Sequence, residues 1–141
     1  MARKPKAFVL DSWAILAYLG DETASQEAAD LIASANENRT PMYITSVNAG
    51  EVWYILAREV SESDADKAIA DLVRLGIEFV PVDWNLARTA AGFKAVKRMS
   101  YADCFAAALT KERRCDLVTG DDEFRQVQNE INIRWLTPTP K

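Results

Sequence analysis

The stretch Ala7-Phe8-Val9-Leu10-Asp11-Ser12-Trp13 decides how the rest of the chain can fold. Its first four residues are apolar and uncharged, which predicts a short buried strand. Asp11 then begins a helix, because apolar residues follow at helical spacing up to Leu19. A strand that ends in an acid places that acid at the carboxyl edge of a sheet, where open α/β sheets bind ligands. Taken alone, Asp11 is equally well explained as a helix cap.

Outward from this stretch, strand and helix patterns alternate along the chain, which predicts parallel strands with helices on both faces of the sheet. The fold class is therefore α/β, a three-layer sandwich with a central, mainly parallel five-stranded sheet. Pro81 favours the edge or the end of its strand. The other strands are predicted at 42–45, 77–82, 115–119 and 131–136. Further helices are predicted at 23–36 and 101–114, and one helix is expected to begin after the caps Ser46 and Asn48. Two more helices are expected, one from Ser61 to the stop at Gly76 and one from the cap Asp83 to residue 96.

The 141 residues are expected to form one domain, 1–141, with loosely ordered ends at 1–6 and 137–141. The start of the sequence has no apolar segment typical of a secretory signal, and no stretch has the length of a membrane span. The expected location is therefore the cytoplasm, with no membrane partner. Cys104 and Cys115 lack metal-ligand spacing and are predicted to be free, buried thiols.

The chain contains no histidine. This excludes Ser-His-Asp and Cys-His catalysis and His-ligated zinc, so an enzyme built from this chain would depend on carboxylates. The net charge of −4 argues against a sequence-independent nucleic-acid binder. It leaves open a nuclease whose acids are neutralised by a metal ion.

Four acids are expected near one edge of the predicted sheet. Asp11 and Asp121 directly follow strands, Glu51 is placed in the first turn of the helix after the second strand, and Asp103 follows the helix start at Ser100. Capping boxes and the helix dipole explain each acid singly. Together, with no basic residue beside any of them, they indicate a site.

Such a cluster of carboxylates favours a bound cation. Two carboxylates about 5 Å apart repel by roughly 3 kcal/mol at an effective dielectric constant near 20. Oxygen ligands without histidine or thiolate select Mg²⁺ or Mn²⁺. These ions activate a water molecule and stabilise the charge on a phosphodiester during in-line displacement.

Four segments around the acids resemble the motifs of the PIN-domain nucleases, and within them the VapC-like toxins of bacterial and archaeal toxin–antitoxin pairs. The order of the segments and the types of acid both agree, over nearly the whole chain. Tyr101 and Cys104 depart from the third motif, and Asp122 is an alternative to Asp121 as the fourth acid. The segments are VLDSWAILAYL (9–19), TSVNAGEV (45–52), MSYADCFAAA (99–108) and LVTGDDEF (117–124).

The resemblance implies a Mg²⁺- or Mn²⁺-dependent endoribonuclease that cuts a structured RNA and is held inactive by a cognate antitoxin. It leaves open whether the acids hold one metal ion or two. The alternative function is a non-catalytic PIN-like module that binds RNA or protein. The implied catalytic and metal-binding residues are Asp11, Glu51, Asp103 and Asp121, supported through hydrogen bonds by Ser12, Asn48 and Thr119.

The resemblance also implies a homodimer, although core packing explains the candidate interface residues equally well. These residues are Trp53, Tyr54, Leu72 and Leu75. A basic cluster before the third motif is either a phosphate contact or a solvated helix face; it comprises Lys94, Lys97 and Arg98. Two other Mg²⁺-dependent families fit less well, because Asp11-Ser12-Trp13 has neither the paired acids of a receiver domain nor the Asp-x-Asp of a haloacid-dehalogenase-type phosphatase.

Overall fold

The computed structural model describes residues 5–20 and 23–137. The expectation of loosely ordered ends falls mainly on residues 1–4 and 138–141, which lie outside the described residues. The elements, in chain order, are β1 (Phe8–Leu10), α1 (Ser12–Leu19), α2 (Thr23–Glu37), β2 (Met42–Thr45), α3 (Ser46–Glu59), α4 (Glu62–Arg74), β3 (Ile77–Val80), α5 (Trp84–Val96), α6 (Tyr101–Arg113), β4 (Asp116–Thr119), the 3-10 helix η1 (Asp122–Val127) and β5 (Asn132–Trp135).

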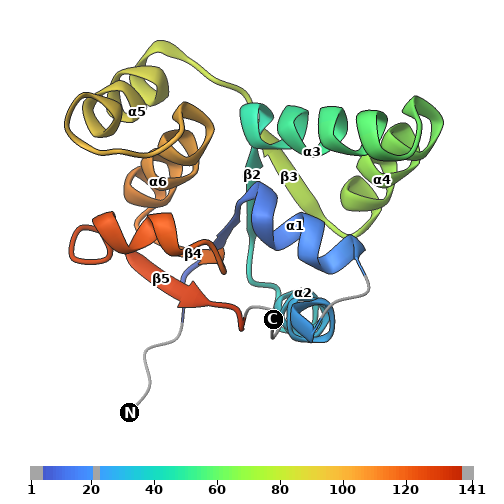
Figure 1. The fold of residues 1–141 in the computed structure, drawn as a ribbon. Helices are drawn as coiled ribbons and strands as arrows, with labels where there is room; N and C mark the ends of the chain where they lie inside the picture. Colours follow the sequence, from blue (N-terminus) through green and yellow to red (C-terminus); the bar gives the residue numbers. More distant parts are fainter. Residues whose placement is uncertain (1–4, 21–22, 138–141) are drawn as a thin grey trace.

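The five strands form one sheet in the order β3-β2-β1-β4-β5, and every pair is parallel. Helices lie on both sides of this sheet (Figure 1). The predicted α/β sandwich with a five-stranded parallel sheet is therefore confirmed. The opening strand β1 is central, and β3 is an edge strand that Pro81 follows directly, as its proline predicted.

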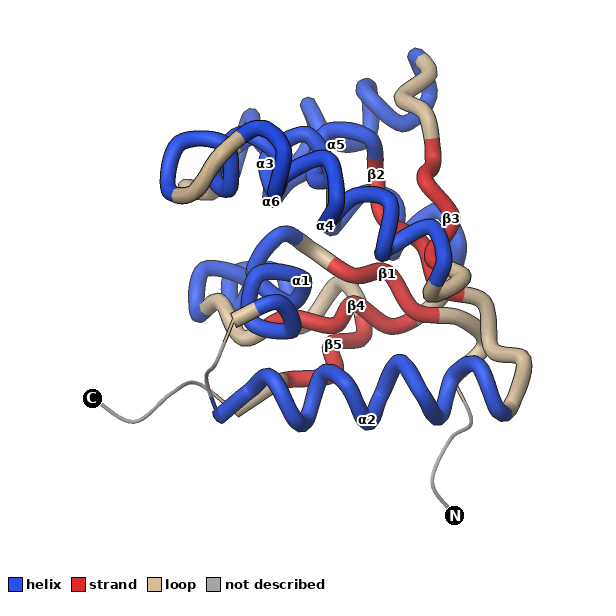
Figure 2. The backbone as a smooth tube through the Cα atoms, turned by 90° about the vertical axis from the view of Figure 1, so that its right-hand side faces the viewer, coloured by secondary structure: helices blue, strands red, loops and turns tan. Residues whose placement is uncertain are grey.

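Successive residues of the central strands supply two separate cores. Val9 of β1 packs on the side of α5 and α6, whereas Phe8 and Leu10 pack on the side of α1 and α2. Leu117 and Val118 of β4 divide in the same way. Figure 2 shows α2 lying along one face of the sheet. The strand interiors are apolar on both sides because helices cover both faces of the sheet.

Most predicted helix starts are confirmed, and one is wrong. Ser61, Asp83 and Ser100 each accept a backbone N–H of the first turn, as N-caps do. The cap of α3, however, is Thr45 and neither Ser46 nor Asn48. Thr45 keeps the extended backbone of β2, and its Oγ1 accepts the N–H of Asn48 at 3.0 Å.

The sequence placed Glu51 in the first turn of α3, and this prediction is wrong. Because α3 begins at Ser46, Glu51 lies in its second turn. Two helices end at residues with a left-handed backbone conformation. Gly76 takes φ +85° and ends α4 as expected, and Arg114 takes φ 51° and ends α6 at Arg113. The helix η1 after β4 was not predicted.

The two cysteines, Cys104 and Cys115, are free and buried, as predicted. Burial raises the pKa of both thiols, to about 11 for Cys115. Both are therefore poor nucleophiles. Within residues 5–20 and 23–137, no helix has the length and apolar character needed to cross a membrane.

Candidate active site

A cavity of about 320 Å³ lies where the carboxyl ends of β1 and β4 meet the starts of α3 and α6. Four acids line it together with three apolar side chains. The lining residues are Ser12, Trp13, Leu16, Glu51, Ile55, Ser100, Asp103, Asp121 and Glu123. We call this cavity the acidic pocket. Three of the four predicted acids thus line one pocket, although they come from α3, α6 and the turn after β4.

A larger hollow of about 660 Å³ lies near the start of β1, alongside α2. Its lining includes charges of both signs, among them Lys6, Glu27, Arg39 and Arg134. Opposite charges side by side can balance each other and do not demand a cation. We therefore place the candidate active site in the smaller, acidic pocket.

Asp11, the fourth predicted acid, lies behind the pocket and is 1% exposed. Its Oδ1 accepts the N–H of Ala14 at 2.8 Å, so the capping role holds, and its Oδ2 accepts the hydroxyl of Thr119 at 2.6 Å. Burial raises the pKa of Asp11 to about 8 against the opposing effect of these hydrogen bonds, and the charges of Asp103 and Asp121 raise it further.

Asp103 has the same kind of environment at the pocket wall. Burial raises its pKa to about 7, and the negative charges of Asp121, Glu51 and Glu123 add to this effect. A hydrogen bond from Ser100 opposes it. The charges that perturb Asp11 and Asp103 therefore tie all the candidate acids into one electrostatic cluster, a property typical of functional sites.

Thr119 links the first and last acid-bearing segments of the chain. Its Oγ1 donates to Asp11 and accepts the N–H of Asp121 at 3.1 Å. One hydroxyl at the end of β4 thereby fixes the turn that carries Asp121 against the turn that carries Asp11. This contact agrees with the supporting role that the resemblance implied for Thr119.

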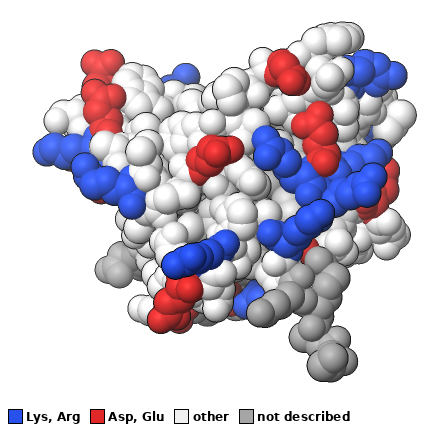
Figure 3. All heavy atoms as spheres, turned by 180° about the vertical axis from the view of Figure 1, so that it is seen from behind, with Lys and Arg blue, Asp and Glu red and all other residues white. Residues whose placement is uncertain are grey.

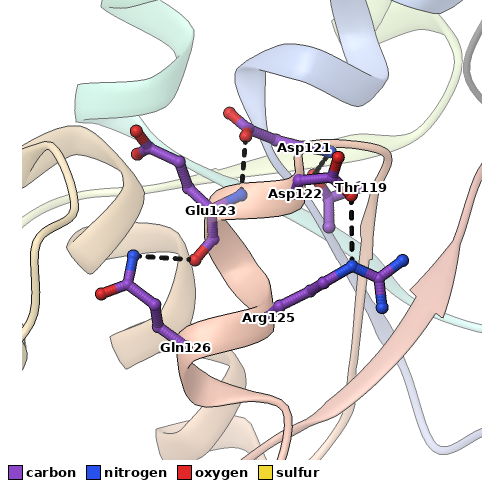
Figure 4. A network of polar contacts seen from close by, with 6 residues as sticks. All are labelled: Thr119, Asp121, Asp122, Glu123, Arg125 and Gln126. Carbon is purple, nitrogen blue, oxygen red and sulfur yellow. Dashed lines mark hydrogen bonds and ion pairs between the residues drawn. The ribbon is translucent and has the colours of Figure 1, made fainter.

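The two neighbouring acids after β4 point in different directions (Figure 4). Asp121 accepts the N–H of Glu123 at 3.0 Å and lines the acidic pocket. Asp122 is turned towards Arg125, with 3.2 Å between its Oδ1 and Nε. The geometry therefore favours Asp121 over Asp122 as a member of the site.

Asn48 is fully buried and joins three of the segments that carry acids. Its Nδ2 donates to the carbonyl of Ala102 at 3.0 Å, beside Asp103. Its own carbonyl accepts the hydroxyl of Ser12 at 3.2 Å, and its Oδ1 accepts the hydroxyl of Thr45. Ser12 and Asn48 thus hold helices α1, α3 and α6 together and do not bond to an acid directly.

No cation balances the acidic pocket within the described part of the chain. The ion pairs there involve other groups, and no Lys or Arg among residues 5–20 and 23–137 pairs with a pocket acid. Two members of the predicted basic cluster are occupied elsewhere, since Lys94 donates to the carbonyl of Met99 and Lys97 pairs with Glu130 at 3.0 Å. These two contacts favour a structural role for the cluster.

As the side chains stand, no three acids or cysteines among residues 5–20 and 23–137 are grouped closely enough to hold an ion. The donor set is nevertheless composed of carboxylates alone, which suits Mg²⁺ or Mn²⁺ held through few protein ligands and several waters. Glu51, Asp121 and Glu123 line the pocket on partly or fully exposed side chains that can move inwards. The residues therefore fit a hard divalent cation by chemistry, without a preformed cage.

The surface of the molecule carries both signs of charge despite the acidic total. Seen from behind, the largest group of Lys and Arg side chains lies on the right of the face, with smaller groups at its left edge and lower centre, and Asp and Glu are scattered (Figure 3). Gathered cationic side chains attract polyanions even when the net charge is negative. The charge of −4 thus does not prevent contact with a phosphate backbone.

The raised pKa values predict how stability depends on pH in the absence of divalent metal. The folded chain binds more protons than the unfolded chain from about pH 4 up to the pKa values of about 7 for Asp103 and about 8 for Asp11. Stability present below this window is lost as the pH rises through it. In EDTA, the urea midpoint should fall between about pH 5 and about pH 8.5.

Asp11→Asn should remove much of this fall, because the buried group no longer titrates, whereas the exposed Glu59→Gln should preserve it. A fall of wild-type size in Asp11→Asn would contradict the raised pKa. Adding Mn²⁺ should restore stability to the wild type mainly at the higher pH, where the carboxylates are ionised.

A family model described as PIN domain matches residues 8–130. No curated protein matches the sequence. Among solved structures, the chain is similar to VapC20 of Mycobacterium tuberculosis, described as a sarcin–ricin loop cleaving toxin. That match has a TM-score of 0.68 and 20% identity, and it covers 86% of this chain and 95% of VapC20.

Two complexes with DNA are also similar in fold. The match to VapBC2 of Rickettsia felis, bound to a promoter fragment, has a TM-score of 0.75 and 11% identity, covering 93% of this chain and 99% of that one. The match to VapBC of Salmonella typhimurium has a TM-score of 0.70 and 18% identity, covering 91% and 96%. At these identities the likeness concerns the fold.

Proposed function

The chain belongs to the PIN domain family, and from this premise we propose that it is a divalent-metal-dependent endoribonuclease, the toxin of a toxin–antitoxin pair. Family membership and the fold shared with VapC toxins support a nuclease. The observation that carries the proposal is that acids from three separate segments line one pocket, with the buried Asp11 of a fourth segment behind it, and that no cation lies beside them in the described part of the chain.

In this proposal, Asp11, Glu51, Asp103 and Asp121 hold Mg²⁺ or Mn²⁺ and are the catalytic acids. When bound, the ion supplies an activated water and charge compensation at a phosphodiester. Glu123 is a fifth candidate that the sequence did not single out, and it is supported by its place in the pocket lining.

The remaining contacts position these acids. Burial and the neighbouring acids raise the pKa of Asp103 to about 7, and a cation held in the pocket would favour its ionised form. Asp11 is held from behind by Thr119 and by the first turn of α1. Asn48 keeps the start of α3 against the start of α6, which sets the spacing between the segments of Glu51 and Asp103.

The proposed partners are an RNA substrate, a cognate antitoxin and a second copy of the chain, in the cytoplasm. The solved structures with similar folds include toxin–antitoxin complexes, which supports an antitoxin. Of the predicted interface residues, Leu72 is fully buried in the core and unable to contact a partner, whereas Tyr54 is 41% exposed on α3. A monomeric mass by light scattering at micromolar concentration would contradict the homodimer.

The cleavage of RNA tests the proposed function directly. Purified protein incubated with total cellular RNA should produce discrete fragments with Mg²⁺ or Mn²⁺ and none with EDTA, and sequencing the new ends should identify the target. Cleavage that persists in EDTA would contradict metal dependence. Binding of RNA with no cleavage under any divalent ion would favour the non-catalytic module.

A further inference from the structure

An aromatic side chain forms part of the wall of the acidic pocket. Trp13 follows Asp11 by two residues and was predicted from its spacing to be an apolar helix position. The structure places it in α1 as predicted, and also in the pocket lining, with Leu16 and Ile55. The side chain is partly buried and packs against the core beneath α1.

The indole ring of Trp13 packs against Gly120. A Cβ added at Gly120 would lie 2.2 Å from Cη2 of Trp13, 2.4 Å from Cζ3 and 2.6 Å from Cζ2. The six-membered part of the ring therefore rests directly against the backbone that precedes Asp121. Gly120 lacks the positive φ that would call for glycine on conformational grounds, so the requirement is for space.

The indole N–H of Trp13 is available to donate a hydrogen bond. Its Nε1 has no hydrogen-bond partner among residues 5–20 and 23–137, in contrast to Trp53, whose Nε1 donates to Asp66 at 2.8 Å. The ring is thus a rigid apolar surface with a free donor, placed between the turns that carry Asp11 and Asp121.

We propose that Trp13 binds an unpaired nucleobase of the RNA, stacking on the base next to the phosphodiester that the acids address. The proposal rests on the proposed function and deepens it, because it selects single-stranded or loop segments over a continuous duplex. Bases in a duplex are stacked on their neighbours and cannot offer a free face, whereas unpaired bases stack readily on aromatic side chains. Leu16 and Ile55 complete an apolar wall for the same base.

Binding measured without turnover tests this role. In the Asp103→Asn background, the affinity is measured by anisotropy for a labelled single-stranded RNA of about 12 nucleotides and for the same strand annealed to its complement. Trp13→Leu should weaken binding of the single strand by roughly 5- to 100-fold, the equivalent of one stacked base. Binding of the duplex should change by less than about twofold.

Aromatic replacement and a distant tryptophan provide the controls. Trp13→Phe should retain most of the affinity, because it keeps a stacking face, and Trp84→Ala should have no effect, since Trp84 is 72% exposed at the start of α5 and outside the pocket. Tryptophan fluorescence should be quenched by the single strand when Trp13 is present and less so in Trp13→Phe. Thermal melting of each variant verifies that it is folded.

Equal affinities of Trp13→Leu and Trp13→Phe for the single strand would overturn the assignment of Trp13. If the wild type still cleaves RNA with Mg²⁺ in that case, the proposed function stands without it. An equal loss for single strand and duplex would also overturn base stacking. A wild type that neither cleaves nor binds RNA would overturn the proposed function and the base-binding role together.

Discussion

Asp103→Asn is expected to reduce metal-dependent RNA cleavage by more than about 100-fold, since loss of an outer-sphere partner alone typically costs 10- to 100-fold. The same substitution should make the metal-free protein more stable near pH 8. Burial and three neighbouring acids raise the pKa of Asp103 to about 7, so its charge is unfavourable in the folded state at that pH. A neutral amide of similar size removes this penalty.

Because Asp103→Asn should lower the cleavage rate and raise the stability, the loss of cleavage cannot be explained by unfolding. Initial cleavage rates are compared with urea unfolding in EDTA for the wild type, Asp103→Asn and Asp122→Asn. Asp122 is the matched control, because it is an acid beside the site that is turned towards Arg125. Asp122→Asn should cleave at nearly the wild-type rate. Cleavage by Asp103→Asn at a similar rate would exclude Asp103 from the reaction.

The strand-end acids could be predicted because parallel topology alone brings them together. Asp11 and Asp121 follow neighbouring strands, β1 and β4, so their convergence needs no knowledge of side-chain packing. Asp103 depended on where its helix starts, and the cap at Ser100 places that start at the same edge. The order of the four motifs then indicated the PIN domain family.

The residues that were misplaced or missed depend on local geometry and packing, which the sequence pattern does not show. The cap at Thr45 was missed because Ser46 and Asn48 are also good capping residues, and the end of β2 decides between them. Glu123 came into the pocket through η1, a short helix with no clear sequence signal. Trp13 has the spacing of a core residue, and its place in the pocket depends on a contact with Gly120, more than a hundred positions away.

Gly120→Ala is expected to lower the free energy of unfolding by about 1–3 kcal/mol, the usual cost of forcing extra atoms into a packed site. The added methyl group would overlap three atoms of the Trp13 ring, and Gly120 itself is buried. Gly50→Ala is the matched control, because nothing lies within 4 Å of a Cβ there and the residue is inside α3. It should raise stability by about 0.5–1 kcal/mol.

A double-mutant cycle decides whether Trp13 is the reason for the glycine. In a Trp13→Ala background the ring is absent, so Gly120→Ala should lose most of its cost, giving a coupling within the range of 0.5–3 kcal/mol found for residues in contact. Additive effects would show that position 120 needs glycine for its backbone alone. If the coupling is found, Gly120→Ala should also weaken binding of single-stranded RNA while all the pocket acids are intact, because the displaced ring no longer faces the base.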